Sequence, residues 1–389
     1  MKFIKHISLI LIFLFISKIN IGQILSPNAE ISVITCAPGN ELYSTFGHSA
    51  IRIKDPVHRI DKVYNYGTFN FETPGFYMKF IRGKLDYMLN VEPYRYFVMS
   101  YIQEKRAIKE QVLNLSDTQK SAIYKALEIN AMPENMYYRY DFLKDNCSTR
   151  ILKIINNAIQ DSLILPRELS GRKKTYREML MPYLENDNWE RFGINLALGL
   201  PVDNTVNIEE SAFLPDYLYI IFENSEIITS KGAKPVVKQE NNLYLPTGKK
   251  IIEISSYTPS RISWILLILV LLFTIIELKY RKYYLLLDKT LFFIFGFIGL
   301  NIMFLWFGTD HSSVINNQNI IWASPFYFIA AFLLKSENKK YLKIFFFLSL
   351  IITVIGFITD LFIIPLFDKA VLPLELILII RTSLICLKK

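Results

Sequence analysis

Cysteine and histidine are scarce in this sequence: its 389 residues include three cysteines and four histidines. So few cysteines argue against a small scaffold stapled by disulfides. The sequence also lacks a metal-ligand cluster, a phosphate-binding loop and a dinucleotide fingerprint. We therefore expect no metal and no cofactor.

The middle of the chain has no net positive charge. The formal net charge is +9, yet residues 23–260 contain 28 basic and 28 acidic residues. The excess lies near the N-terminus and in the apolar C-terminal part, where basic residues set membrane topology. The charge therefore does not indicate a nucleic-acid partner.

The first 22 residues have the pattern of an export signal. Lys2 and Lys5 precede the apolar run ISLILIFLFI, and Gly22 and Gln23 follow where cleavage is expected. This pattern predicts a secretory signal peptide over 1–22. An uncleaved N-terminal anchor is the alternative.

Long apolar stretches are confined to the part of the chain after residue 261. Several of them approach the ~20 residues that cross a bilayer. They predict an all-α membrane bundle of about five transmembrane helices. The stretches are roughly 262–278, 290–307, 319–335, 342–365 and 371–387.

The loops between these stretches differ in charge. Lys and Arg gather in the first and third loops and at the C-terminus, whereas GTDHSSVINNQN has none. The positive-inside rule places the basic loops and the C-terminus in the cytoplasm, and the segment before 261 outside it. We expect an exported domain over 23–227, a polar linker over 228–260 and a transmembrane domain over 261–389. Arg381 and Glu375, in the last stretch, are candidates for a buried pair.

The exported part combines strand and helix patterns. ISVITC, HSAIRI and VYNYGTFNF have the β-rich or alternating composition of strands. Ser116 and Gln119 form a capping-box pattern, which predicts a helix from about 117. A second helix is expected to begin at or near Cys147, with apolar residues on one face. These patterns predict an α+β fold.

The stretch DFLKDNCSTR contains a candidate nucleophile, Cys147. A helix N-terminus lowers a thiol's pKa, and a catalytic thiol also needs a base. His48, at the start of a predicted strand, is the best placed of the four histidines, and Asn65 or Asn70 is a candidate to orient its ring. The alternatives are an inert buried thiol or a disulfide between Cys147 and Cys36.

Several motifs together resemble a known family. ISVITCAPGNELYSTFGHSAIRIKD, VYNYGTFNF, KDNCSTR and LGLPVDN with FLPDYL resemble the exported domain of Lnb-type lipoprotein N-acyltransferases. WFGTDHSSVINNQNIIWASP is similar to the membrane half of that family. The order of His before Asn-Cys is also similar to circularly permuted papain-like folds, with His on the sheet and Cys on the packing helix.

The resemblance implies an acyl transfer. A membrane phospholipid would donate an acyl chain to Cys147 as a thioester, and the α-amine of a diacylated lipoprotein would accept it. His48 would be the base and Asn65 the orienting residue. The expected location is the bacterial inner membrane with the N-terminal domain in the periplasm. The residues expected near the oxyanion or substrate are Asn146, Ser148, Asn70, Asp310 and His311.

Two other readings use the same residues. A membrane-anchored cell-envelope amidase or peptidase would employ the same Cys–His pair on water or a peptide. A non-enzymatic envelope protein would instead bind a ligand through a domain stabilised by a Cys36–Cys147 disulfide.

Overall fold

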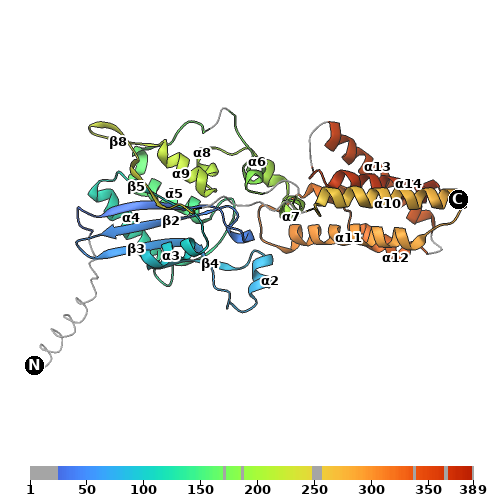
Figure 1. Cartoon of the computed structure of the whole chain (residues 1–389), viewed down its shortest axis with the longest axis horizontal. Coiled ribbons are helices and arrows are strands. Elements are labelled where there is room, and N and C mark those ends of the chain that lie inside the picture. The colour runs from blue at the N-terminus through green and yellow to red at the C-terminus, as the bar shows by residue number, and fades with distance from the viewer. Residues whose placement is uncertain are drawn as a thin grey trace, which may run out of the picture.

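The computed structural model describes residues 25–169, 172–184, 188–247, 256–335, 339–362 and 367–387. A domain built on a β-sheet and a helical bundle lie end to end (Figure 1). The predicted signal peptide, residues 1–22, lies outside the described residues.

The exported domain is built on a seven-stranded antiparallel sheet with the order β10-β5-β1-β2-β3-β4-β6. The patterns ISVITC, HSAIRI and VYNYGTFNF fall on β1, β2 and β3, which confirms these three predictions. The strands are β1 Glu30–Cys36, β2 His48–Asp55, β3 Ile60–Thr68, β4 Asp86–Pro93, β5 Ile108–Leu113, β6 Tyr137–Arg139 and β10 Val237–Tyr244.

Helices cover both faces of this sheet. One face packs against α4 (Asp117–Asn130), α5 (Cys147–Ile159) and α9 (Pro215–Glu223), and a cluster of buried apolar side chains fills most of the space between them. The other face packs against α3 (Tyr94–Gln103). The arrangement is an α+β fold that places the start of α5 against the sheet (Figure 1).

The helix starts follow from local capping. Ser116 accepts from the backbone N–H of Gln119 and completes the predicted capping box. In α5 the apolar residues recur on one side and are buried, as the sequence predicts. The remaining short helices are η1 Leu42–Ser44, α2 Phe76–Ile81, η2 Gln160–Ser162, α6 Tyr176–Leu180, η3 Met181–Tyr183, α7 Trp189–Ala197, η4 Leu200–Asp203 and α8 Ile208–Ser211.

The segment predicted as a polar linker, 228–260, differs from that expectation in its first part. β8 (Glu226–Thr229) and β9 (Gly232–Pro235) form a small sheet with β7 (Leu163–Ile164). β10 then joins the main sheet as an edge strand beside β5. An edge strand with an exposed face tolerates a polar sequence such as VKQENNLY, which is why its composition resembles a linker.

The C-terminal half is helical and apolar. It contains α10 (Pro259–Tyr280), α11 (Leu285–Gly308), α12 (Phe326–Leu333), α13 (Lys339–Phe362) and α14 (Val371–Leu387), with η5 (Gln318–Ile321) ahead of α12. Within the described residues, three helices are long and apolar enough to cross a membrane: Pro259–Tyr280, Leu285–Gly308 and Lys340–Phe362. The third predicted span is shorter because Pro325 starts α12 anew after η5, and the fifth, α14, has 17 residues.

The predicted pairing of Arg381 with Glu375 is wrong. Arg381 instead donates to Glu277 Oε2 at 2.6 Å and to Asp288 Oδ1 at 2.5 Å. Arg381 and Glu375 are six residues apart, a spacing that does not bring two side chains onto one face of a helix. Both oxygens of Glu375 are buried without a hydrogen-bond partner among the described residues.

Candidate active site

Cys147 is the first residue of α5, and Asn146 caps that helix. Asn146 Oδ1 accepts from the backbone N–H groups of Ser148 at 2.9 Å and Thr149 at 3.0 Å. Its amide nitrogen donates to the carbonyls of Phe142 at 2.8 Å and Phe213 at 2.7 Å. Because every polar atom of this cap is engaged, the start of the helix is held in place, and the thiol sits where the helix dipole favours a negative charge.

His48 opens β2 and Asn65 lies on the neighbouring strand β3. His48 Nε2 lies 2.6 Å from Asn65 Oδ1. The Asn65 amide nitrogen donates to Glu92 Oε1 at 3.3 Å, which directs the amide oxygen toward the ring. Since an amide oxygen only accepts, Nε2 carries the proton and Nδ1 remains for the thiol.

The pKa values of Cys147 and His48 depend on each other. Burial raises the pKa of Cys147, but attraction to His48 and a hydrogen bond with it outweigh burial and lower the pKa to about 7. Burial lowers the pKa of His48, and the negative charge and hydrogen bond of Cys147 reverse this, so that the His48 pKa is raised. The backbone N–H of Ser49 also lowers the thiol's pKa. Each partner therefore stabilises the charged form of the other at neutral pH.

A glycine lets the sheet approach the thiol closely. Gly67 has φ +85°, and a Cβ placed there would lie 3.6 Å from Cys147 Cβ and 3.5 Å from the Tyr140 ring. A larger residue at this position would be strained and would fill space beside the thiol. The wall of the site next to Cys147 is thus made of backbone and of Tyr140.

Tyr138, on the edge strand β6, places a second polar group near the thiol. Its hydroxyl is 4.0 Å from the same Cβ position on Gly67, and it is buried without a partner in the described part of the chain. The Arg150 guanidinium lies 3.4 Å from the centre of its ring. Burial raises the Tyr138 pKa, so the hydroxyl is a proton donor at neutral pH. The sequence gives no signal for this residue, because only the pairing of β6 with β4 brings it here.

The other predicted residues lie at different distances from the pair. Ser148 donates to Ser49 Oγ at 3.1 Å, directly behind the thiol. Asn70 lies in an exposed turn after β3, where its side-chain oxygen accepts from the N–H of Glu72 at 2.9 Å. Asp310 and His311 contact the end of α2: the Asp310 N–H donates to Arg82 O at 2.9 Å, and His311 Nε2 lies 3.1 Å from Ile81 O. The structure therefore brings His48, Asn65 and Cys147 together and leaves Asn70 apart.

Cys36 is a second buried thiol close to the site. It lies opposite His48 in the β1–β2 pairing, and Cys36 and Cys147 are both free. The structure thus contradicts the alternative of a disulfide between them. Burial raises the Cys36 pKa far above its usual range, so this thiol stays protonated.

The two thiols are expected to differ in their reaction with iodoacetamide. Only the thiolate is alkylated, so labelling of Cys147 should rise with pH and reach half of its plateau near pH 7, the pKa of Cys147. Cys36 should stay unlabelled over this range. Peptide mass spectrometry at a series of pH values would measure both. Equal labelling of Cys36 and Cys147 would contradict the assigned environments.

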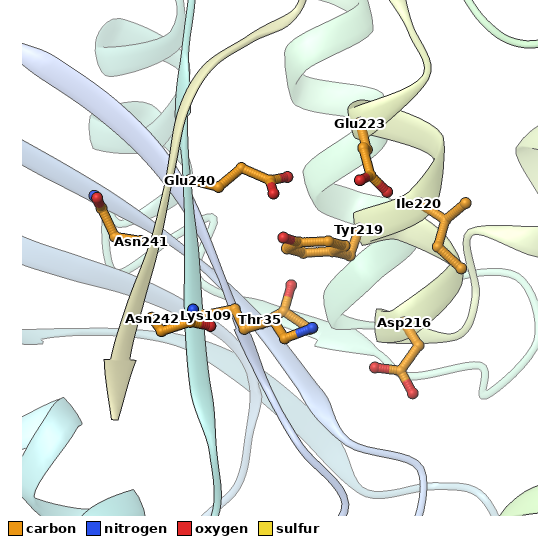
Figure 2. A pocket seen from close by; sticks show the side chains of 9 residues that line it. All are labelled: Thr35, Lys109, Asp216, Tyr219, Ile220, Glu223, Glu240, Asn241 and Asn242. Atoms are coloured by element: carbon orange, nitrogen blue, oxygen red, sulfur yellow. The ribbon is translucent and has the colours of Figure 1, made fainter. Parts of the chain in front are cut away.

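A pocket of about 650 Å³ lies elsewhere, between α9 and strands β1, β5 and β10 (Figure 2). Its lining combines acidic and amide side chains with Lys109 and Tyr219 and includes neither Cys nor His. It contains no thiol–imidazole pair like that of Cys147 and His48. No group of metal-ligating side chains occurs among the described residues either.

These observations define a class: a membrane-anchored protein whose exported α+β domain carries a Cys–His–Asn site. Comparison with protein families then identifies the chain. Residues 19–181 match the Lnb N-terminal periplasmic domain, and residues 251–389 match the Lnb transmembrane domain. The chain belongs to the Lnb-type family, which indicates a lipoprotein-modifying membrane enzyme with a periplasmic N-terminal domain. Comparisons with curated proteins and with solved structures give no match.

Proposed function

We propose that this protein is a lipoprotein N-acyltransferase that uses Cys147 as its nucleophile. The observation that carries the proposal is the Cys147–His48 pair, with a thiol pKa of about 7, in a domain joined to membrane helices. The acyl donor is a membrane phospholipid, and the acceptor is the N-terminal diacylglyceryl-cysteine of a lipoprotein. The His-then-Cys order also suits a permuted papain-like domain. The site lies on the periplasmic side of the inner membrane, with the C-terminus in the cytoplasm.

The first half of the reaction forms a thioester. His48 Nδ1 takes the proton of Cys147, and the thiolate attacks the ester carbonyl of the lipid. Asn146 already engages the N–H groups of Ser148 and Thr149. We therefore assign the oxyanion to the N–H of Cys147 and the hydroxyl of Tyr138. The carbon–oxygen bond then breaks, the lyso-lipid oxygen takes the proton from His48, and the acyl group remains on sulfur.

The second half transfers the acyl group to nitrogen. The neutral α-amine of the lipoprotein attacks the thioester carbonyl and loses a proton to His48. The carbon–sulfur bond breaks, because a thiolate with a pKa near 7 is a better leaving group than an amine. An amide is formed and Cys147 returns to its starting state.

A cell-envelope amidase or peptidase is the second candidate, because the same Cys–His pair would serve it. The membrane helices favour the acyltransferase, since both of its substrates are anchored in a bilayer. A binding protein without catalysis is the third candidate, and the free state of Cys36 and Cys147 removes the disulfide on which it depended.

The test is to incubate the full-length protein in phospholipid membranes with a diacylated lipoprotein and to measure intact masses. We expect one added acyl chain on the lipoprotein N-terminus and a hydroxylamine-sensitive acyl adduct on Cys147. A lipoprotein cleaved or left unmodified, with no adduct on the enzyme, would reject acyl transfer and favour a hydrolase or a binding protein.

Replacing Asn65 with alanine should lower the rate of acyl transfer by about 10²-fold, the size of effect seen when general base catalysis is impaired. The reason is that the Asn65 oxygen fixes the proton on Nε2 and turns Nδ1 toward the thiol. Asn135→Ala is a matched control, because Asn135 is exposed and donates to Ile129 O, away from the site. Steady-state rates of acyl transfer would be measured for both variants. If Asn65→Ala is as fast as Asn135→Ala, Asn65 does not orient the His48 ring.

Replacing Tyr138 with phenylalanine should lower the acylation rate by roughly 10²-fold, as the loss of one oxyanion donor does. It should leave thermal stability unchanged, since the hydroxyl has no partner within the described residues. Tyr183→Phe is the opposite control: it removes a 2.9 Å hydrogen bond to Asp216 and should reduce stability but not rate. A Tyr138→Phe enzyme with the wild-type rate would remove Tyr138 from the mechanism.

A further inference from the structure

The segment around α2 exposes a dense group of apolar side chains. Phe71 is 64%, Tyr77 76%, Met78 59%, Phe80 43% and Ile81 44% exposed. Exposed apolar side chains gathered in one segment mark a site of contact with a protein, a ligand or a membrane.

The patch lies at the end of a membrane-crossing helix. Arg82 Nε donates to Gly308 O at 3.3 Å, and Gly308 is the last residue of α11. His311, just beyond α11, lies 3.2 Å from Phe80 O and 3.1 Å from Ile81 O through its Nε2 atom. Figure 1 shows α2 beside this end of the bundle. Because α11 is long enough to span the bilayer, its end on the exported side lies at the membrane surface, and α2 lies there too.

The basic residues around the patch also favour a position at the membrane surface. Lys79, Arg82 and Lys84 lie within or directly after α2. Basic residues at the membrane surface attract lipid phosphates, while aromatic rings occupy the headgroup region. A helix with exposed Phe, Tyr, Met and Ile among such residues is typical of a segment that lies in the interface.

A row of aromatic rings connects the patch to the nucleophile. The Phe76 and Phe69 rings are 5.7 Å apart, Phe69 and Tyr87 are 5.3 Å apart, and Tyr87 and Tyr140 are stacked at 4.3 Å. Tyr140 adjoins Cys147 across Gly67, as described above. Consecutive ring contacts thus run from α2 to the side of the thiol, and Phe69, Tyr87 and Tyr140 are each partly exposed along this row.

We propose that the segment Phe69–Ile81, with Tyr87 and Tyr140, is a lipid-binding surface that inserts into the outer leaflet and guides an acyl chain of a bilayer phospholipid to Cys147. The proposal rests on the proposed acyl transfer for its purpose, but the insertion itself does not require it. Phe80, Tyr77 and Ile81 contact the bilayer, and Phe69, Tyr87 and Tyr140 line the path of the chain.

The first experiment compares two double variants of the full-length protein in vesicles of phosphatidylethanolamine and phosphatidylglycerol. Tyr77→Asp/Phe80→Asp places charge on the surface. Ile164→Asp/Ile228→Asp is the control, since these residues are 47% and 45% exposed on β7 and β8. Each protein is given the vesicle lipid or the water-soluble ester p-nitrophenyl butyrate, and acylated Cys147 is measured by intact mass.

We expect the surface variant to acylate from vesicle lipid at least tenfold more slowly than wild type, and from the soluble ester within twofold of it. The control should stay within twofold on both. Loss with both substrates would show that α2 only supports the site, and a wild-type rate from vesicles would show that the lipid does not use this surface. Either result overturns the proposal.

The second experiment measures insertion without activity. p-Benzoylphenylalanine is placed at position 77 or at position 228, and irradiation in the same vesicles is followed by mass analysis. A phospholipid adduct at 77 and none at 228 is expected. Absence of a lipid adduct at 77 overturns the proposal even if acyl transfer is established. An adduct at 77 with an inactive wild-type enzyme would uphold insertion while rejecting the proposed function.

Discussion

Cys147→Ala is expected to abolish lipoprotein acylation, with a loss of roughly 10⁴-fold or more, as for other catalytic nucleophiles. No other group in the site has the properties of Cys147. Its pKa is lowered to about 7, and it lies at the start of α5 against His48. Intact masses of the lipoprotein and the enzyme would both be measured. The variant should show neither the acylated lipoprotein nor the acyl-enzyme.

Cys36→Ala is the matched control for this prediction. Cys36 is buried in the same region but faces away into the core below α3, and its raised pKa keeps it protonated. Its replacement should preserve acyl transfer and reduce stability by about 1 kcal/mol. The assignment of Cys147 as the nucleophile would be wrong if the Cys147→Ala enzyme were active, or if the Cys36→Ala enzyme folded but were inactive.

Local sequence was sufficient to find His48 and Cys147 because each lies in a short, unusual motif. It did not separate Asn65 from Asn70, since both follow the same aromatic pattern. The structure separates them because β3 ends at Thr68, so that only Asn65 remains on the sheet beside His48. Glu92 and Tyr138 are brought in by β4 and β6, whose pairing depends on contacts far apart in the chain. No local pattern encodes such positions.

Sequence pattern predicted the fold where an element is buried. α5 buries one face against the core, and β1 to β3 are buried over most of their length between the helices on the two faces of the sheet, so their apolar and β-branched sequences carry the signal. β10 is a polar edge strand and lacks it. Hydropathy likewise marked all the apolar stretches, but it does not report helix length or lateral contacts. The partners of Arg381 come from α10 and α11, about a hundred residues earlier, and only packing reveals them.

Arg381→Met is expected to destabilise the membrane half by roughly 3–5 kcal/mol, the usual cost of breaking a buried ion pair on one side. Arg381 is 0% exposed and forms ion pairs with both Glu277 and Asp288. It also donates to Thr274 Oγ1 at 2.8 Å. Without Arg381 two carboxylates would remain buried close together. Thermal unfolding in detergent should show a fall in Tm of several degrees or loss of the folded protein.

Two further variants separate this network from a general effect of losing a positive charge. Arg281→Met removes an exposed arginine that follows α10 and should leave Tm almost unchanged. The triple variant Arg381→Met/Glu277→Gln/Asp288→Asn removes all three charges and should recover most of the lost stability, because no uncompensated charge remains. If the triple variant is as unstable as Arg381→Met, the packing of the arginine stem between α10, α11 and α14 matters more than its charge. The cost would then come from a cavity rather than from electrostatics.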